Sequence, residues 1–279
     1  MTRLFYCTLL LTLFLTFIAH AQTAQAEIKD YLLPEYTTTE IHYQYGNAQN
    51  PFNGTDTFKT VITTQNASGW KWGSTFFFVD YAKDAIDDDG TNFNDENIYL
   101  EAYLNLSLSA LLKQDVSYGA VKDVGLIMGT NYSRDAAVLK YTPGLRLSWD
   151  VPGFAFLNTD FMAFIDDSAG KKQNARNAPS EENSWFMDVN YLYPFDVSTQ
   201  KFMITGHAEF VKGRQLDDIV DGRKKDWFMA QTQIRWDVGH ALFDKANKFY
   251  IGTEWQYWNN KLGTNTDENM AQLLAVFRF

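Results

Sequence analysis

Histidine is the residue type in this chain best suited to act as a general base, and three histidines, His42, His207 and His240, follow residue 21. A hydrolase would need such a base beside a nucleophile, with a third group to orient it. None of the three stands in a recognisable serine, histidine and asparagine motif. The sequence therefore predicts a protein that is not an enzyme, with hydrolysis kept as an alternative.

Ionisable side chains recur at every second position of several segments, where they would share one face of a strand. Charges of both signs on one surface can pair with one another, or they can line a polar path for a solute. Aromatic rings at such positions can stack on a flat solute or simply fill space. The candidate solute-contacting residues are Glu40, His42, Tyr99, Glu101, Tyr103, Asp123, Lys140, Arg146, Asp160, Phe186, Asp188, His207, Glu209, Arg235 and Glu254.

One acidic stretch resembles a calcium-binding loop. Counting from Ala85, the residues Asp87, Asp89, Gly90 and Glu96 fall at the third, fifth, sixth and twelfth positions. Alanine offers no carboxylate at the first position, and the pattern shows no flanking helices. We therefore predict no metal site and no cofactor.

Strict alternation identifies the elements that must carry the polar residues. From Ile98 to Leu108 the even positions are apolar, and from Ala137 to Trp149 the odd positions are. Period two predicts β-strands, although Pro143 interrupts the second run because proline cannot donate to a strand ladder. Twelve such segments are predicted, at 35–45, 56–66, 68–81, 96–110, 120–132, 137–149, 154–166, 183–193, 199–212, 226–238, 247–258 and 268–279.

The length of these segments and the connections between them indicate a membrane barrel. Many segments exceed the ~5–6 residues usual in soluble strands and suit a tilted membrane strand of ~9–11. Every second connection is long (46–55, 82–95, 167–182, 213–225, 259–267), except 133–136, and those between are mostly short, such as 67, 150–153 and 194–198. Long loops on one side and tight turns on the other are typical of outer-membrane barrels. An exported soluble β-sandwich is the alternative, since its strands also alternate.

Composition narrows the class further. The chain has 279 residues, with 24 Lys and Arg against 34 Asp and Glu, and a formal charge of −10, which argues against nucleic-acid binding. Hydrophobic residues make up 46%, too many for a disordered chain, while the mean hydropathy of −0.31 is too low for a helical membrane bundle. We predict an all-β fold, a transmembrane antiparallel β-barrel of about twelve strands.

The first residues have the order of a secretory signal peptide. Arg3 precedes the apolar run 4–19, and small residues then frame two cleavage sites, after Ala21 and alternatively after Ala26. Cys7, the single cysteine, lies inside the run, so the mature protein would contain no thiol. The predicted organisation is a signal peptide at 1–21 followed by one barrel domain at 27–279.

One block of the sequence carries a family resemblance. It comprises Tyr99-Leu-Glu-Ala-Tyr-Leu-Asn-Leu-Ser-Leu-Ser109, then Asp115-Val-Ser-Tyr-Gly119 and Val121-Lys122-Asp123. This block resembles the Tsx/OmpK family of nucleoside-specific outer-membrane channels. In addition, an alternating last strand that ends in an aromatic residue, here Phe279, resembles the C-terminus of bacterial outer-membrane proteins in general. The Trp-Trp-His cluster of that family's first strand is absent, and Glu40-Ile41-His42 stands in that region.

The resemblance implies passive, selective diffusion of nucleosides or similar small flat solutes through a narrow polar lumen. It also implies location in the cell outer membrane of a Gram-negative bacterium. The expected partners are nucleosides or other small solutes, outer-membrane lipid and lipopolysaccharide, and the export and barrel-assembly machinery, with no nucleic acid. We expect a monomer. A barrel that serves as a surface receptor or structural protein, without a selective pore, is the alternative function.

Overall fold

The structure is a computed structural model that describes residues 31–85, 96–170 and 177–279. The predicted signal peptide lies outside these ranges, as does most of the calcium-like loop. Among the described residues no helix is long and apolar enough to span a membrane.

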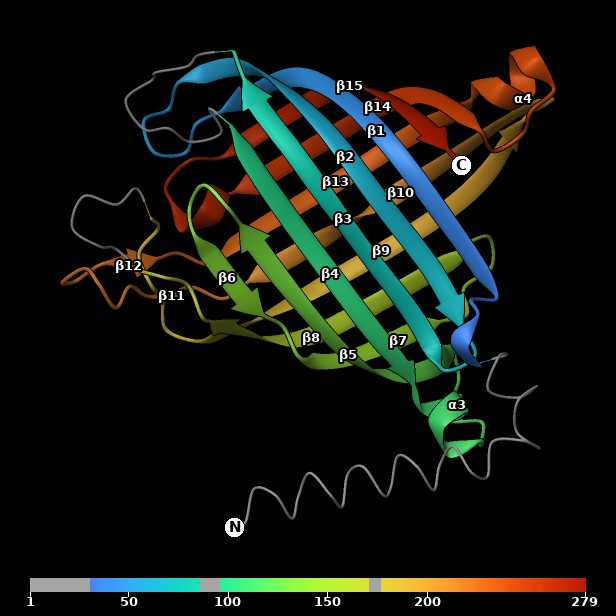
Figure 1. Cartoon of the computed structure of the whole chain (residues 1–279), viewed down its shortest axis with the longest axis horizontal. Coiled ribbons are helices and arrows are strands. Elements are labelled where there is room, and N and C mark those ends of the chain that lie inside the picture. Colours follow the sequence, from blue (N-terminus) through green and yellow to red (C-terminus); the bar gives the residue numbers. More distant parts are fainter. Residues whose placement is uncertain (1–30, 86–95, 171–176) are drawn as a thin grey trace, which may run out of the picture.

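One antiparallel sheet makes up the body of the molecule and closes on itself. The last strand pairs with the first, with Glu40 opposite Arg278 and Gly46 opposite Gln272. Figure 1 shows this pairing as the red β15 beside the blue β1. The strands are β1 (Tyr36–Gln49), β2 (Asp56–Trp70), β3 (Gly73–Asp84), β4 (Asn97–Ser107), β5 (Val121–Ser133), β6 (Val138–Tyr141), β7 (Gly144–Trp149), β8 (Phe156–Asp166), β9 (Ser184–Val197), β10 (Gln200–Val211), β13 (Trp227–Asp237), β14 (Phe249–Asn259) and β15 (Glu268–Arg278).

The predicted twelve-stranded antiparallel barrel is confirmed, because β6 and β7 are two halves of one predicted strand. Both halves lie between β5 and β8, and Pro143 separates them. The Pro143 carbonyl accepts from Ala163 N, whereas the missing N–H of proline breaks the ladder, as expected.

A second proline, Pro194, is tolerated inside β9, which continues to Val197. Leu192 accepts from Ala155 N on the β8 side, and beyond that bond β8 offers no further partner. In an antiparallel strand the backbone groups of residues two apart point to the same side, so the backbone nitrogen of Pro194 points toward β8, as Leu192 does. No β8 residue lies opposite Pro194, so its missing N–H leaves no hydrogen bond unmade. The predicted connection at 194–198 is therefore reduced to Ser198 and Thr199 between β9 and β10.

The predicted turn at Ala67 is wrong. β2 extends to Trp70, and the turn to β3 lies at Lys71 and Trp72. Ser68 and Asn66 hydrogen-bond to Thr37 on the neighbouring β1, with distances of 2.9 and 3.0 Å, so cross-strand side-chain pairs extend this polar stretch as strand.

Short elements close the two ends. At the end that carries the start of β1 and the last residue lie α3 (Leu108–Leu112) and α4 (Val238–Phe243), each capped by the residue before it, Ser107 and Asp237. The other end carries the short hairpin of β11 (Arg214–Gln215) and β12 (Arg223–Lys224) and the 3-10 turn Lys261–Gly263. In outer-membrane barrels the short turns face the periplasm and the longer loops face outward.

Side chains inside the barrel form layers. Along β9 the inward residues run from Phe186 through Asp188 and Asn190 to Leu192. Phe186 belongs to an apolar cluster near the loop end, with Ile127, Met162, Phe164 and Val211. Leu192 packs against a second cluster toward the other end, formed by Met203, Tyr250, Leu274 and Val276. A polar layer therefore separates two apolar ones.

Two tryptophans near strand ends, Trp227 and Trp258, point into the barrel. Trp227 packs against the apolar cluster around Phe186, and Trp258 is buried against Trp227 with ring centroids 5.1 Å apart. The outward aromatic residues include Tyr81, Tyr132, Trp185 and Trp255, each at least 39% exposed to the membrane side.

Candidate functional site: a polar belt in the lumen

The polar layer is a chain of hydrogen bonds around the inner wall, here called the polar belt. It begins at Arg146 on β7 and reaches Gln65 on β2, crossing the inward faces of β8, β9, β10, β13, β14 and β1. In order, its members are Arg146, Asp160, Asn190, Asp188, His207, Gln231, Glu254, Gln233, Arg235, Glu40 and Gln65. The belt contains seven of the residues predicted from sequence.

Glu40 is the most connected member of the belt. Its Oε1 accepts from Arg278 Nε at 2.7 Å, and its Oε2 accepts from Arg235 Nη1 at 3.0 Å. Gln65 Nε2 and His42 Nε2 each lie 2.8 Å from the same Oε2. Glu40 and His42 are both 1% exposed, so this charge is fully removed from water and is stabilised by two guanidinium groups.

Glu254 is held by amides alone. Its two carboxylate oxygens accept from Gln44 at 2.6 Å, Gln233 at 2.6 Å and Gln231 at 2.7 Å. Gln44 comes from β1, two strands away, so this contact reaches past β15. Hydrogen bonds to a buried carboxylate stabilise its charged form without a neutralising cation.

The opposite part of the belt joins two acids to one arginine and one histidine. Arg146 donates to both oxygens of Asp160 at 2.7 and 2.6 Å. Asn190 Nδ2 then bridges Asp160 at 3.1 Å and Asp188 at 2.9 Å. His207 Nδ1 lies 3.0 Å from Asp188 Oδ1, and Glu209 lies two residues along the same strand face.

Glu101 and two tyrosines lie on the remaining wall. The Tyr103 and Tyr99 hydroxyls donate to the Glu101 carboxylate at 2.9 and 2.5 Å, and Asn131 Nδ2 donates at 2.8 Å. Alternation correctly assigned the three β4 residues to one face. Two phenol rings beside a carboxylate offer both a stacking surface and a hydrogen-bond acceptor.

Lys140 belongs to a different cluster, at the loop end of the barrel. Its Nζ donates to Asp166 at 2.6 Å and to Glu181 at 2.8 Å, while Arg214 and Lys224 also pair with Glu181. Burial alone would raise the pKa of Glu181, but Lys224, Arg214 and Lys140 together lower it to about 2. The cluster fixes loop residues to the barrel rim.

Two more predicted residues lie apart from the polar belt. Asp123 Oδ1 accepts from the Ser109 hydroxyl at 2.8 Å and so holds the turn that contains α3. Phe186 packs edge-on against Phe164, with centroids 5.5 Å apart, in the apolar cluster. A turn-holding hydrogen bond explains the position of Asp123, and packing explains that of Phe186.

Sequence reasoning missed the amide side chains. Asn131, Asn190, Gln44, Gln231 and Gln233 connect the charged groups, and each is on the same strand face as a predicted residue. The alternation that identified Glu254 and Arg235 as inward-facing applies equally to these amides. Their position along the strand therefore predicts that they face inward, although they carry no charge.

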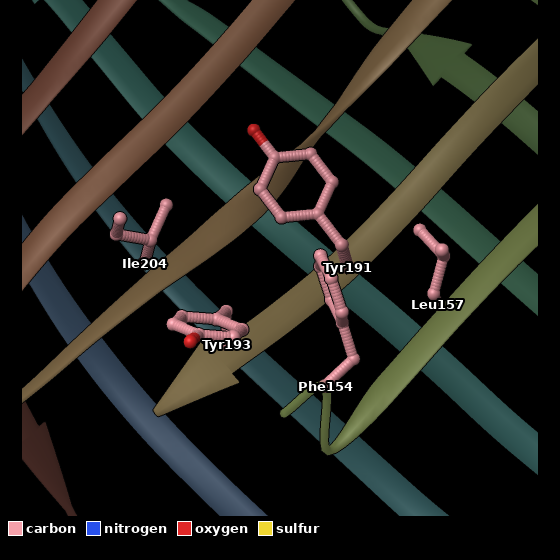
Figure 2. A pocket seen from close by; sticks show the side chains of 5 residues that line it. All are labelled: Phe154, Leu157, Tyr191, Tyr193 and Ile204. Atoms are coloured by element: carbon pink, nitrogen blue, oxygen red, sulfur yellow. The ribbon is translucent and has the colours of Figure 1, made fainter. Parts of the chain in front are cut away.

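A groove on the outer wall is separate from the lumen. Phe154, Leu157, Tyr191, Tyr193 and Ile204 line it, and Figure 2 shows their side chains around the same stretch of β8, β9 and β10. Tyr191 and Tyr193 alternate with the inward Asn190 and Leu192, so they face the membrane. Aromatic rings at this position are typical of the interface belt of membrane proteins.

Comparisons with known proteins identify the architecture. No family model matches the sequence, and no curated protein matches it. An outer membrane channel from Pseudomonas putida F1 superposes with a TM-score of 0.50 at 12% identity, over 87% of this chain and 95% of that one. The NanC porin gives 0.49 at 15% identity over 86% and 98%, and the KdgM porin 0.46 at 7% over 86% and 99%. The chain thus has the fold of an outer-membrane β-barrel, in agreement with its predicted location in the cell outer membrane.

Proposed function

We propose that this protein is a narrow channel for the passive diffusion of small polar solutes that are neutral or positively charged. The observation that carries the proposal is the acidic polar belt. In the part of the inner wall that the structure describes, carboxylates outnumber guanidinium groups: the carboxylates are Glu40, Glu101, Asp160, Asp188, Glu209 and Glu254, and the guanidinium groups are Arg146, Arg235 and Arg278. Such a surface attracts cations and repels anions in a confined lumen.

Nucleosides are the solutes we propose first. They are neutral, their bases are flat, and their sugar hydroxyls donate hydrogen bonds. Glu101 between Tyr99 and Tyr103 offers an acceptor for a hydroxyl and rings for a base. A nucleotide adds a phosphate that the surrounding carboxylates would repel. The resemblance of residues 99–123 to the nucleoside channels supports the same choice.

Planar-bilayer conductance of the refolded protein tests this proposal. Adenosine, thymidine, adenosine monophosphate and glucose are titrated as blockers, and heat-modifiable migration in gels confirms folding. Block by the two nucleosides, without block by the nucleotide or the sugar, is the expected result. A current indifferent to all four compounds would contradict nucleoside selectivity.

The second candidate is a receptor or structural barrel without a selective pore. The two apolar layers favour it, because Phe186, Val211 and Tyr250 are each only 1% exposed and occupy the inner wall on both sides of the polar belt. A solute has to pass beside the less buried His207, Glu209 and Arg278. A folded protein that carries no current in the same bilayer experiment would select this candidate.

A further inference from the structure

The inward face of the β9–β10 hairpin brings together three side chains that ligate metals. Asp188, His207 and Glu209 each place one ligand atom within 4.8 Å of the others. Asp188 lies directly opposite Glu209 in the strand pairing, and His207 is two residues from Glu209 on the same face. Because the strands fix all three Cβ positions, the cluster is held by rigid elements.

Charge around this cluster is unbalanced. Arg146 neutralises Asp160 through two hydrogen bonds, and His207 contacts Asp188. Among the described residues, however, the Glu209 carboxylate makes no hydrogen bond or ion pair, and Glu101 is bonded only to neutral groups. Carboxylates in a lumen wall at low dielectric, without cations of their own, favour uptake of a cation from solution.

The imidazole of His207 is oriented as metal-ligating histidines are. Its Nε2 lies 3.4 Å from Gln231 Oε1, and Gln231 is fixed because its own amide nitrogen donates to Glu254 at 2.7 Å. An amide oxygen only accepts, so Nε2 carries a proton. A carboxylate oxygen also only accepts, so Nδ1, 3.0 Å from Asp188 Oδ1, donates to it, and a metal ion would bind at Nδ1 by displacing that proton while Gln231 keeps Nε2–H in place.

We propose that Asp188, His207 and Glu209 bind a divalent transition-metal ion inside the lumen, with Gln231 as the positioning residue. One imidazole nitrogen and two carboxylate oxygens match the ligand preferences of Zn²⁺ and its neighbours in the series. At Zn²⁺ bond lengths of ~2.0–2.2 Å, tetrahedral ligands lie about 3.4 Å apart, so small rotations of the Glu209 side chain close the site. The three ligands come from two strands, so no local motif in the sequence marks this site.

A second lumenal histidine provides a matched control. His42 also contacts a carboxylate, Glu40, at 2.8 Å, but Arg235 and Arg278 already neutralise that carboxylate. This part of the belt has no surplus negative charge, so we expect it to bind no metal.

Isothermal titration of Zn²⁺ into untagged, metal-stripped and refolded full-length barrel tests the proposal, with folding verified by circular dichroism and heat-modifiable migration. The wild type and His42→Gln are expected to bind one Zn²⁺ per chain. His207→Gln and Glu209→Gln are expected to bind at least about tenfold more weakly, since each loses a ligand. Glu209→Gln keeps the test decisive if His207→Gln fails to fold, because Glu209 forms no hydrogen bond among the described residues.

Two results would overturn the metal site. One is a folded wild-type barrel that takes up no Zn²⁺ at millimolar concentration. The other is Zn²⁺ uptake that Glu209→Gln leaves unchanged or that His42→Gln abolishes. Neither result bears on conductance, so the metal site and the channel proposal are tested separately.

Discussion

Arg235 on β13 donates to Glu40 on β1 across two intervening strands, with Nη1 and Oε2 3.0 Å apart. Both side chains are buried, and Glu40 also pairs with Arg278. This contact joins strands that are not neighbours in the sheet and is independent of the strand ladder. A substitution at Glu40 can therefore measure the contribution of this contact to the free energy of unfolding without changing the backbone pairing.

Replacing Glu40 with glutamine should destabilise the barrel by about 3–5 kcal/mol, because the buried Arg235 guanidinium and the partly buried Arg278 guanidinium lose their counter-charge. Urea unfolding in detergent, followed by tryptophan fluorescence, measures the change. Asp196→Asn is the control, since Asp196 and Lys201 form an exposed pair at 3.6 Å worth at most about 1 kcal/mol. Equal effects of the two substitutions would contradict a structural role for Glu40.

The loop cluster around Glu181 should withstand acid unusually well. The pKa of Glu181 is lowered from an ordinary value of 4.5 to about 2, so its stabilising charge is fully present above 4.5 and is lost as the pH falls through 2. Pepsin cleavage within residues 213–225, corrected for the pH dependence of pepsin on an unstructured peptide, should be slow above about pH 4.5 and increase progressively as the pH falls from 4.5 to 2. In Glu181→Gln, cleavage should be fast throughout; slow cleavage of that variant would show that other contacts hold the loop.

The proposed solute contacts should respond to small changes at Glu101 and Tyr103. Tyr103→Phe keeps the ring but removes the hydroxyl that donates to Glu101 at 2.9 Å, and Glu101→Gln removes the charge. We expect each to weaken adenosine block by about two- to tenfold, the worth of one hydrogen bond. Tyr45→Phe on the outer face is the control and should leave block unchanged. Unaltered block in both lumenal variants would place the nucleoside elsewhere.

Gly206 on β10 should not tolerate a side chain. Its φ is +154°, and a Cβ there would lie 2.0 Å from the Gln231 carbonyl oxygen. Gly206→Ala should cost more than about 1 kcal/mol in the same urea experiment, since it adds a collision to the conformational penalty. Gly119→Ala tests the penalty alone, because φ is +60° with open space around it. A smaller loss at Gly206 than at Gly119 would contradict the collision.

The barrel architecture was predictable from sequence because each strand shows a local alternation of apolar and polar residues. The odd positions 99, 101 and 103 carry polar atoms and the even ones do not, and this pattern alone assigns Glu101 to the lumen. The end of β2 was not predictable in the same way. Asn66, Ser68 and Gly69 have the composition of a turn, and pairing with β1, which includes side-chain hydrogen bonds to Thr37 and Thr39, keeps them in the strand.

Which side chains pair inside the lumen depends on how the sheet closes into a barrel, and the spacing of residues in the sequence does not reveal this. Glu40 and Arg235 meet only because the sheet curves into a barrel, and Glu181 reaches Lys140 from a loop without periodic pattern. Alternation in the sequence therefore predicts which residues share a strand face. It left open which residues pair, which cap a turn as Asp123 does, and which pack as Phe186 does.

The pairing of β1 with β15 has a kinetic consequence. Glu40 and Arg278 are 238 positions apart, so the contact that closes the sheet is among the least local that the chain can form. Loop-closure entropy must be overcome before that contact gives any stabilisation, which makes such topologies slow to fold. Until then β1 and β15 each present an unpaired edge, and the nascent protein must be kept from associating with other strands throughout that interval.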